Sequence, residues 1–250
     1  MLPHNIKEIL DAKVQQYECP DFIENDPISI PHRFSSKEDI EISGFLAATL
    51  AWGNRKAIIK SANEMMRRFD NAPADFVLNA SESEIDALQS FVYRTFKDTD
   101  LPCFVRALRH IYKEHGGLES VFAPSPDDNS IRSSIINLRN TMLPFLDPHT
   151  QKHVPNLLKE SAAKRICMYL RWMVRPNDRG VDFGLWQSIK KENLVLPLDV
   201  HVGNVALNLG FITKNGKDWK TAMAITNKLR EFRPDDPVAY DFALFSMDME

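Results

Sequence analysis

Apolar residues recur along most of this chain with the spacing of amphipathic helices. Within residues 35–53 they fall three or four positions apart, and the segment opens with a capping-box pattern from Ser35 to Glu38 and closes on a glycine. Similar patterns predict further helices at residues 5–17, 54–69, 73–79, 82–90, 101–115, 130–144, 162–175, 183–190, 200–209, 217–231 and 237–248. No segment alternates between apolar and polar residues as a half-buried strand does. The sequence therefore predicts an all-α fold of roughly ten to twelve short helices joined by short connections.

Loops are predicted where proline, aspartate and asparagine accumulate. Residues 122–130 and 146–156 have this composition, and a shorter loop is expected at residues 176–180. Either of the first two loops can separate two lobes of a single domain. We expect the lobes to span approximately residues 35–125 and 126–250.

Composition narrows the classes of function. The chain is 44% hydrophobic and 26% charged and has a formal net charge of −3, values that are ordinary for a soluble globular protein. This balance gives no global attraction to nucleic acid or acidic membranes, so either partner would need a local patch. The longest apolar run, FLAATLAW, falls far below the roughly 20 residues of a membrane span. The first residues do not resemble a signal peptide, so we expect a cytoplasmic monomer without a membrane partner.

No metal or cofactor is expected. The three cysteines, Cys19, Cys103 and Cys167, lie far apart and form no CxxC motif, which argues against a disulfide framework and a cysteine metal cluster. His149 and His153 have a spacing that a metal site could use, but they lie in a predicted loop that contains a proline.

Positive charge is concentrated in residues 159–191. This segment carries eight cations against three carboxylates, whereas the rest of the chain is acidic. The cations are Lys159, Lys164, Arg165, Arg171, Arg175, Arg179, Lys190 and Lys191. A basic segment in an otherwise acidic protein is typical of a local site for a polyanion. A solvated basic helix face is the alternative interpretation.

Asp199 stands at the start of a further predicted helix. It follows an apolar run and precedes an amphipathic one in the stretch LVLPLDVHVGNVALNLG, residues 194–210. An aspartate at this position is a favourable N-cap. The same carboxylate would also be available for chemistry, and the two roles are compatible because a capping carboxylate is held in place.

Four blocks of the sequence resemble the helix-hairpin-helix DNA glycosylases, the superfamily of endonuclease III and 8-oxoguanine glycosylase. Residues 197–205, PLDVHVGNV, are similar to the family segment V-D-T-H-I-x-R-V. Residues 46–65, LAATLAWGNRKAIIKSANEM, are similar to the family block L-L-S-A-Q-x-T-D-x-x-V-N-K-A, which lines the DNA. Residues 93–122 and 229–247 resemble two further helical segments of the family. The chain also resembles an uncharacterised bacterial family described only as a domain of unknown function, through the block K-R-x-x-x-[YF]-L-R-W-M-V-R.

The resemblance implies a two-lobed helical fold in which residues 1–34 pack on the C-terminal lobe. It also implies a role for individual positions. Lys164 would be the nucleophile, and Asp199 would stabilise the cationic sugar and relay protons. The remaining matched or neighbouring positions would contact nucleic acid, and they are Trp52, Asn54, Arg55, Arg165, Arg171, Arg175 and His201.

These residue types suit cleavage of an N-glycosidic bond. Breaking that bond builds positive charge on the sugar C1′, which a nearby carboxylate stabilises. A neutral amine can then attack C1′ and form a Schiff base. The expected function is therefore DNA repair by a base-excision glycosylase, with or without lyase activity on abasic sites, acting on double-stranded DNA that carries a lesion. Lys190 and Lys191 are alternative nucleophiles, and Lys164 is otherwise a surface lysine.

The sequence also departs from the glycosylase pattern. The hairpin that reads L-P-G-V-G-x-K-T-A in the family corresponds to LLKESAAKRI, residues 157–166, which contains no glycine. Lys164 and Asp199 are further apart than the usual separation of about 20 positions, and the four-cysteine iron–sulfur loop is absent. An alternative is therefore a nucleic-acid-binding module of the same fold with altered or absent catalysis. A purely structural helical protein is a third interpretation.

Overall fold

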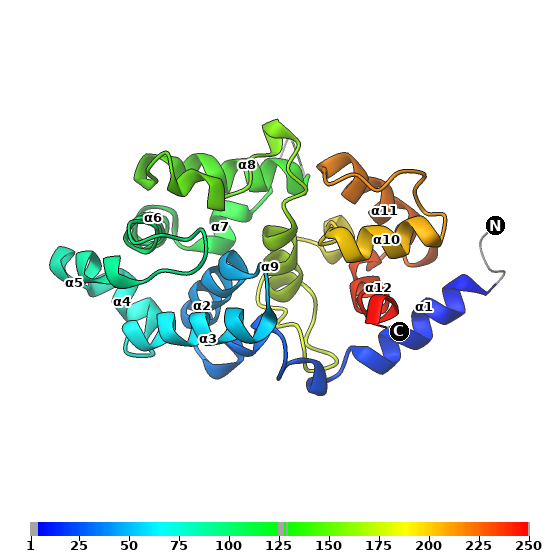
Figure 1. Ribbon diagram of the computed structural model, residues 1–250, viewed down its shortest axis with the longest axis horizontal. Coiled ribbons are helices and arrows are strands. Elements are labelled where there is room, and N and C mark those ends of the chain that lie inside the picture. The colour runs from blue at the N-terminus through cyan, green and yellow to red at the C-terminus, as the bar shows by residue number, and fades with distance from the viewer. Residues whose placement is uncertain (1–4, 125–127, 129, 250) are drawn as a thin grey trace. The chain divides into compact units, whose positions relative to one another are not determined.

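The computed structural model describes residues 5–124, 128 and 130–249. Across these residues the chain is helical and contains no strand, which confirms the all-α prediction. The α-helices are α1 (Ile6–Tyr17), α2 (Lys37–Leu50), α3 (Arg55–Arg68), α4 (Pro73–Asn79), α5 (Glu82–Ala87), α6 (Asp100–His115), α7 (Leu118–Phe122), α8 (Ile131–Met142), α9 (Lys164–Val174), α10 (Val200–Asn208), α11 (Trp219–Phe232) and α12 (Tyr240–Met249). Short 3-10 turns connect several of them (Figure 1). Among the described residues, no helix has both the length and the apolar composition to cross a bilayer.

The chain divides into two compact units. One contains residues 1–24 and 156–250, and the other contains residues 25–155. The division therefore falls at residues 155 and 156 rather than near the expected position at 125. The reason is that α8 packs against α6 and α7, so the segment after residue 125 stays with the helices that precede it.

The unit of residues 25–155 is built around α2 and α6. Ser36 caps α2 by accepting a hydrogen bond from the amide of Asp39, and every side chain from Ile40 to Leu50 is buried. Helix α2 packs against α3 and α4, while α6 packs against α4, α7 and α8. The apolar positions predicted from the spacing in residues 35–53 therefore lie inside the protein.

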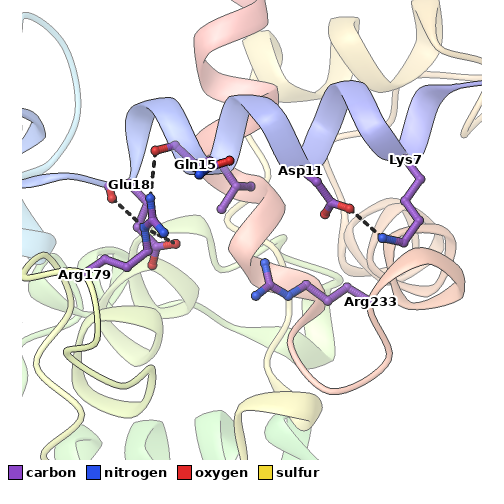
Figure 2. Close-up of a pocket in the computed structure, with 7 residues that line it drawn as sticks. Lys7, Asp11, Gln15, Glu18, Arg179 and Arg233 are labelled. Atoms are coloured by element: carbon purple, nitrogen blue, oxygen red, sulfur yellow. Dashed lines mark hydrogen bonds and ion pairs between the residues drawn. The ribbon is translucent and has the colours of Figure 1, made fainter.

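The unit that contains residues 156–250 is centred on α12. Helix α12 packs against α1 and α10 (Figure 1). Figure 2 shows how α1 is held at its C-terminal end, where the Arg179 guanidinium donates hydrogen bonds to the carbonyls of Glu18 and Gln15 at 3.0 and 2.8 Å. A cation there satisfies carbonyls that have no partner within the helix. A cavity of about 400 Å³ lies beside α1, and Arg233 extends towards it.

Residues 183–190 do not form the predicted helix. Instead the segment follows the end of α9, where the amides of Phe183 and Trp186 donate to the carbonyls of Trp172 and Met173 at 2.8 and 3.0 Å. Gly184 has a φ of +62°, and a Cβ at this position would lie 2.9 Å from the backbone of Pro176. The prediction was wrong because the apolar pattern there serves burial of an extended segment against α9, with Trp186 1% exposed.

Candidate active site at the starts of α9 and α10

Lys164 and Asp199 meet where two helices begin. Lys164 is the first residue of α9, and Asp199 is the N-cap of α10. The Lys164 Nζ donates to Asp199 Oδ2 at 2.8 Å, and the amide of Val202 donates to Asp199 Oδ1 at 2.9 Å. One carboxylate oxygen therefore caps the helix and the other faces the ammonium, and the predicted N-cap is confirmed.

A ligand can reach this pair. The Lys164 side chain is 37% exposed and the Asp199 side chain is 26% exposed. Burial alone would raise the pKa of Asp199, but the Lys164 charge, its hydrogen bond and the Val202 amide outweigh it and hold this pKa below its usual value. Asp199 is therefore ionised at neutral pH and is fixed in one orientation.

A second carboxyl group, that of Asp241, lies close to the pair. It is buried in the first turn of α12, and it accepts a hydrogen bond from Arg171 Nη1 at 2.6 Å. Burial raises the pKa of Asp241, and the charge on Asp199 raises it further, while Arg171 opposes both. The sequence analysis did not single out Asp241, although an aspartate in the first turn of a helix is a recognisable N-terminal signal.

The turn that precedes α9 adopts a left-handed backbone without glycine. Glu160 has a φ of 57° and Ala163 has a φ of 51°, and both flank the short link between the 3-10 turn Leu157–Lys159 and α9. Non-glycine residues pay about 1–2 kcal/mol each for this conformation. This turn is thus formed by residues that the sequence would not mark as turn formers.

Two other predicted residues lie next to the pair. His201 is exposed in the first turn of α10, and its charge when protonated acts on Asp199. Arg165 follows Lys164, and burial lowers the pKa of its guanidinium to about 10. Arg165 is still protonated at neutral pH, so it adds positive potential beside Lys164.

Arg171 and Arg175 do not face solvent. Both side chains are buried, and both are held by carboxylates. Arg171 contacts Asp182 and Asp241, whereas Arg175 contacts Glu18, Asp182 and Asp236. Their donors are consumed inside the protein, so we do not retain these two arginines among the proposed DNA contacts. The alternative lysines are also paired elsewhere, Lys190 with Glu192 and Lys191 with Asp235.

The remaining predicted residues belong to the unit of residues 25–155. Asn54 is the N-cap of α3, accepting from the amide of Ala57 at 3.2 Å, and Arg55 is the first residue of that helix. The Trp52 ring stacks on the His153 ring at 5.7 Å, with 21° between their planes, and is partly exposed. The Trp52 ring is therefore held at the start of a helix rather than enclosed in the core.

A buried aspartate positions the ring beneath Trp52. Asp100 accepts hydrogen bonds from His153 Nε2 at 2.9 Å and from Thr150 Oγ1 at 2.5 Å. Sequence reasoning missed this contact because the partners lie about fifty positions apart in separate segments. The described residues contain no group of three or more histidine, cysteine or acidic side chains placed to hold a metal ion.

Comparison with known proteins identifies a family. Residues 26–250 match the model of the family described as "Protein of unknown function (DUF2400)". No curated protein and no solved structure matches the chain.

Proposed function

Because the chain belongs to the DUF2400 family, whose description assigns no function, we propose its function from its own residues: it binds duplex DNA and excises a damaged or modified base by cleaving the N-glycosidic bond. The observation that carries this proposal is the partly exposed pair of Lys164 and Asp199, 2.8 Å apart at the starts of α9 and α10. A base must leave the duplex stack to reach such a pair.

The lowered pKa of Asp199 supports a division of roles within the pair. A carboxylate that stays ionised stabilises the positive charge that develops at C1′, and the cap contact keeps it from turning away. The same ionisation makes Asp199 a poor proton acceptor. The proton that the Lys164 ammonium must lose would therefore go to the departing base.

The resulting step balances. The bond between C1′ and the base nitrogen breaks, and its electron pair leaves with the base, which takes the proton from Lys164. The neutral amine forms a new bond to C1′. Opening of the sugar ring then gives a Schiff base, which borohydride reduces to a stable amine.

Trapping on an abasic site tests the nucleophile. We expect borohydride to link the wild-type protein covalently to an oligonucleotide that carries an abasic site, and Lys164→Ala and Lys164→Gln to give no adduct. Lys190→Ala is the matched control, because Lys190 is exposed and its ion pair among the described residues is with Glu192, at 3.8 Å. Equal trapping by wild type and both Lys164 variants would reject the assignment.

Two Asp199 variants separate chemistry from folding. Asparagine keeps the N-cap, so Asp199→Asn loses only a partly exposed ion pair, worth under about 1 kcal/mol of unfolding free energy. Asp199→Ala loses the cap as well and costs about 1 kcal/mol more. Both variants should lose trapping by at least about tenfold, a barrier increase of about 1.4 kcal/mol. A wild-type trapping rate in Asp199→Asn would show that the carboxylate is only a cap.

The alternative is a DNA-binding module that does not cleave. It would give salt-dependent binding to lesion-containing duplex and no adduct or released base with the wild-type protein. That result would reject catalysis and retain DNA binding as the function.

A further inference from the structure

Three exposed lysines lie in residues 210–221, which comprise the loop between α10 and α11 and the first turn of α11 and are called the α10–α11 loop. Lys214, Lys217 and Lys220 are exposed, and none of them makes a hydrogen bond or ion pair within the part of the chain that the structure describes. The only acid in residues 210–221 is Asp218. The loop therefore presents more positive charge than it neutralises, in contrast to the buried arginines of α9.

The one acid of the loop is already engaged. Asp218 is the N-cap of α11, and its Oδ1 accepts from the amide of Thr221 at 2.8 Å. This backbone hydrogen bond is the main reason that the pKa of Asp218 is lowered, with the charges of Lys220 and Lys214 adding to the effect. Among the described residues, Asp218 forms no ion pair with Lys214, Lys217 or Lys220, although the charges of two of them act on it.

The loop is anchored on both sides. On one side Asn215 packs over Gly203 of α10, and its amide group donates to Asn204 Oδ1 at 2.8 Å. On its own C-terminal side Gly216 is closed against Thr221, since a Cβ at Gly216 would overlap the Thr221 hydroxyl. The lysines therefore project from a backbone with a fixed course.

This anchored loop lies beside the turn that leads to Lys164. The amide of Trp219 donates to the carbonyl of Glu160 at 3.1 Å, and Ser161 and Asp218 form an isolated antiparallel bridge. A cavity of about 520 Å³ opens in the loop, with Lys214 and Lys220 in its wall together with Thr213. The free lysines are thus continuous with the turn that holds the candidate nucleophile.

We propose that this α10–α11 loop is a docking surface for the phosphate backbone of duplex DNA, contacted by Lys214, Lys217 and Lys220. The choice of DNA rests on the proposed function, whereas the anionic nature of the partner rests on the free lysines alone. Lysine supplies a mobile point charge without the paired geometry of a guanidinium. Three exposed ammonium groups within seven residues suit a phosphate backbone, whose affinity for a protein comes mainly from its charge.

The dependence of binding on salt tests the surface. We would measure fluorescence anisotropy of the full-length protein with a labelled duplex that carries a stable abasic-site analogue, over a salt series. Each phosphate contact contributes about −0.9 to the slope of log K against log salt, so replacing Lys214, Lys217 and Lys220 by glutamine should reduce the slope by about 2.7. Replacing the same three residues by arginine should retain it.

A matched control replaces three lysines outside the loop, Lys113, Lys190 and Lys228, by glutamine and changes the net charge equally. An unchanged slope in the loop variant overturns the proposal, and so does an equal fall in the control. Thermal melts of both triple variants show whether they are folded. If the triple loop variant is unfolded, the single variants of Lys214, Lys217 and Lys220 to glutamine should each reduce the slope of log K against log salt by about 0.9. Tighter, equally lysine-dependent binding of single-stranded RNA or of a free nucleotide would also overturn duplex DNA as the partner.

This experiment is separate from the test of catalysis, because it measures binding and no bond cleavage. A loop-dependent slope with neither a borohydride adduct nor base release keeps the docking surface and rejects the glycosylase. An adduct with a loop-independent slope does the reverse.

Discussion

Replacing Arg175 by methionine should cost the protein much of its stability. The Arg175 side chain is 3% exposed, and its guanidinium lies 2.7 Å from Glu18 Oε1 and 3.0 Å from Asp236 Oδ1, with Asp182 against the same group. Burial alone would lower its pKa, but these carboxylates raise it, so Arg175 is charged at any accessible pH. Methionine fills a similar volume but removes the cation that three buried carboxylates share.

The magnitude follows from the cost of leaving a buried charge unpaired. Removing one partner of a buried ion pair typically costs about 3–5 kcal/mol of unfolding free energy. The whole unfolding free energy of a domain is roughly 5–15 kcal/mol. We expect the Arg175→Met variant to lose at least about 3 kcal/mol of unfolding free energy at pH 7 in urea denaturation. The control is Arg67→Met, because the Arg67 side chain is 71% exposed and pairs with Glu64, and this variant should keep nearly all of the wild-type unfolding free energy.

The deficit should shrink in acid. Without Arg175 the three buried carboxylates lie near one another without the cation that they share, which destabilises the folded state while they carry charge. Strong acid neutralises carboxylates in the folded and in the unfolded protein, so this cost to the unfolding free energy decreases as the pH falls. A loss below about 1 kcal/mol at pH 7, or a deficit that grows as the pH falls, would refute this reasoning and return Arg175 to the solvent-exposed contacts.

Two further predictions concern the turn before α9 and the support beneath Trp52. Glu160→Gly should stabilise the protein by about 0.5–1 kcal/mol, because glycine adopts a φ of 57° without strain. The control, Lys60→Gly within α3, should destabilise the protein by about 1 kcal/mol. If urea titrations give both variants a change of the same sign in unfolding free energy, the backbone argument is wrong. Asp100→Asn should cost about 2 kcal/mol at pH 7, through the contact to His153. Burial alone would raise the pKa of Asp100, but the hydrogen bonds from His153, Thr150 and the Lys97 amide outweigh burial and lower the folded pKa. The stability that these contacts supply is therefore present above pH ~4 and is lost as the pH falls further. If the difference between the unfolding midpoints of wild type and Asp100→Asn stays constant from neutral to acidic pH, the contribution of the ionised Asp100 carboxylate to stability is refuted.

Local signals predicted the helices well. The capping carboxylate of Asp199 and the period of the apolar residues in 35–53 act over a few neighbouring positions, and both gave the correct element. Residues 183–190 show where such signals fail. Their apolar pattern is satisfied by contacts with α9, and the left-handed Gly184 breaks the helix. The pairing of Lys164 with Asp199 joins two segments that no local pattern connects, and only the resemblance to the glycosylases suggested it.

The basic segment was the weakest guide, because a count of charges does not say where they point. Arg171 lies four positions after the buried Cys167 and three before the buried Val174, so helical spacing already places it on the inner face of α9. Each of the buried cations found carboxylate partners within the protein. The lysines of the α10–α11 loop lie outside the basic segment 159–191, yet within the part of the chain that the structure describes they make no hydrogen bond or ion pair. A polyanion gains most from charges that the protein has not already neutralised, so the pairing of each cation, rather than the local excess of positive residues, decides where it can bind.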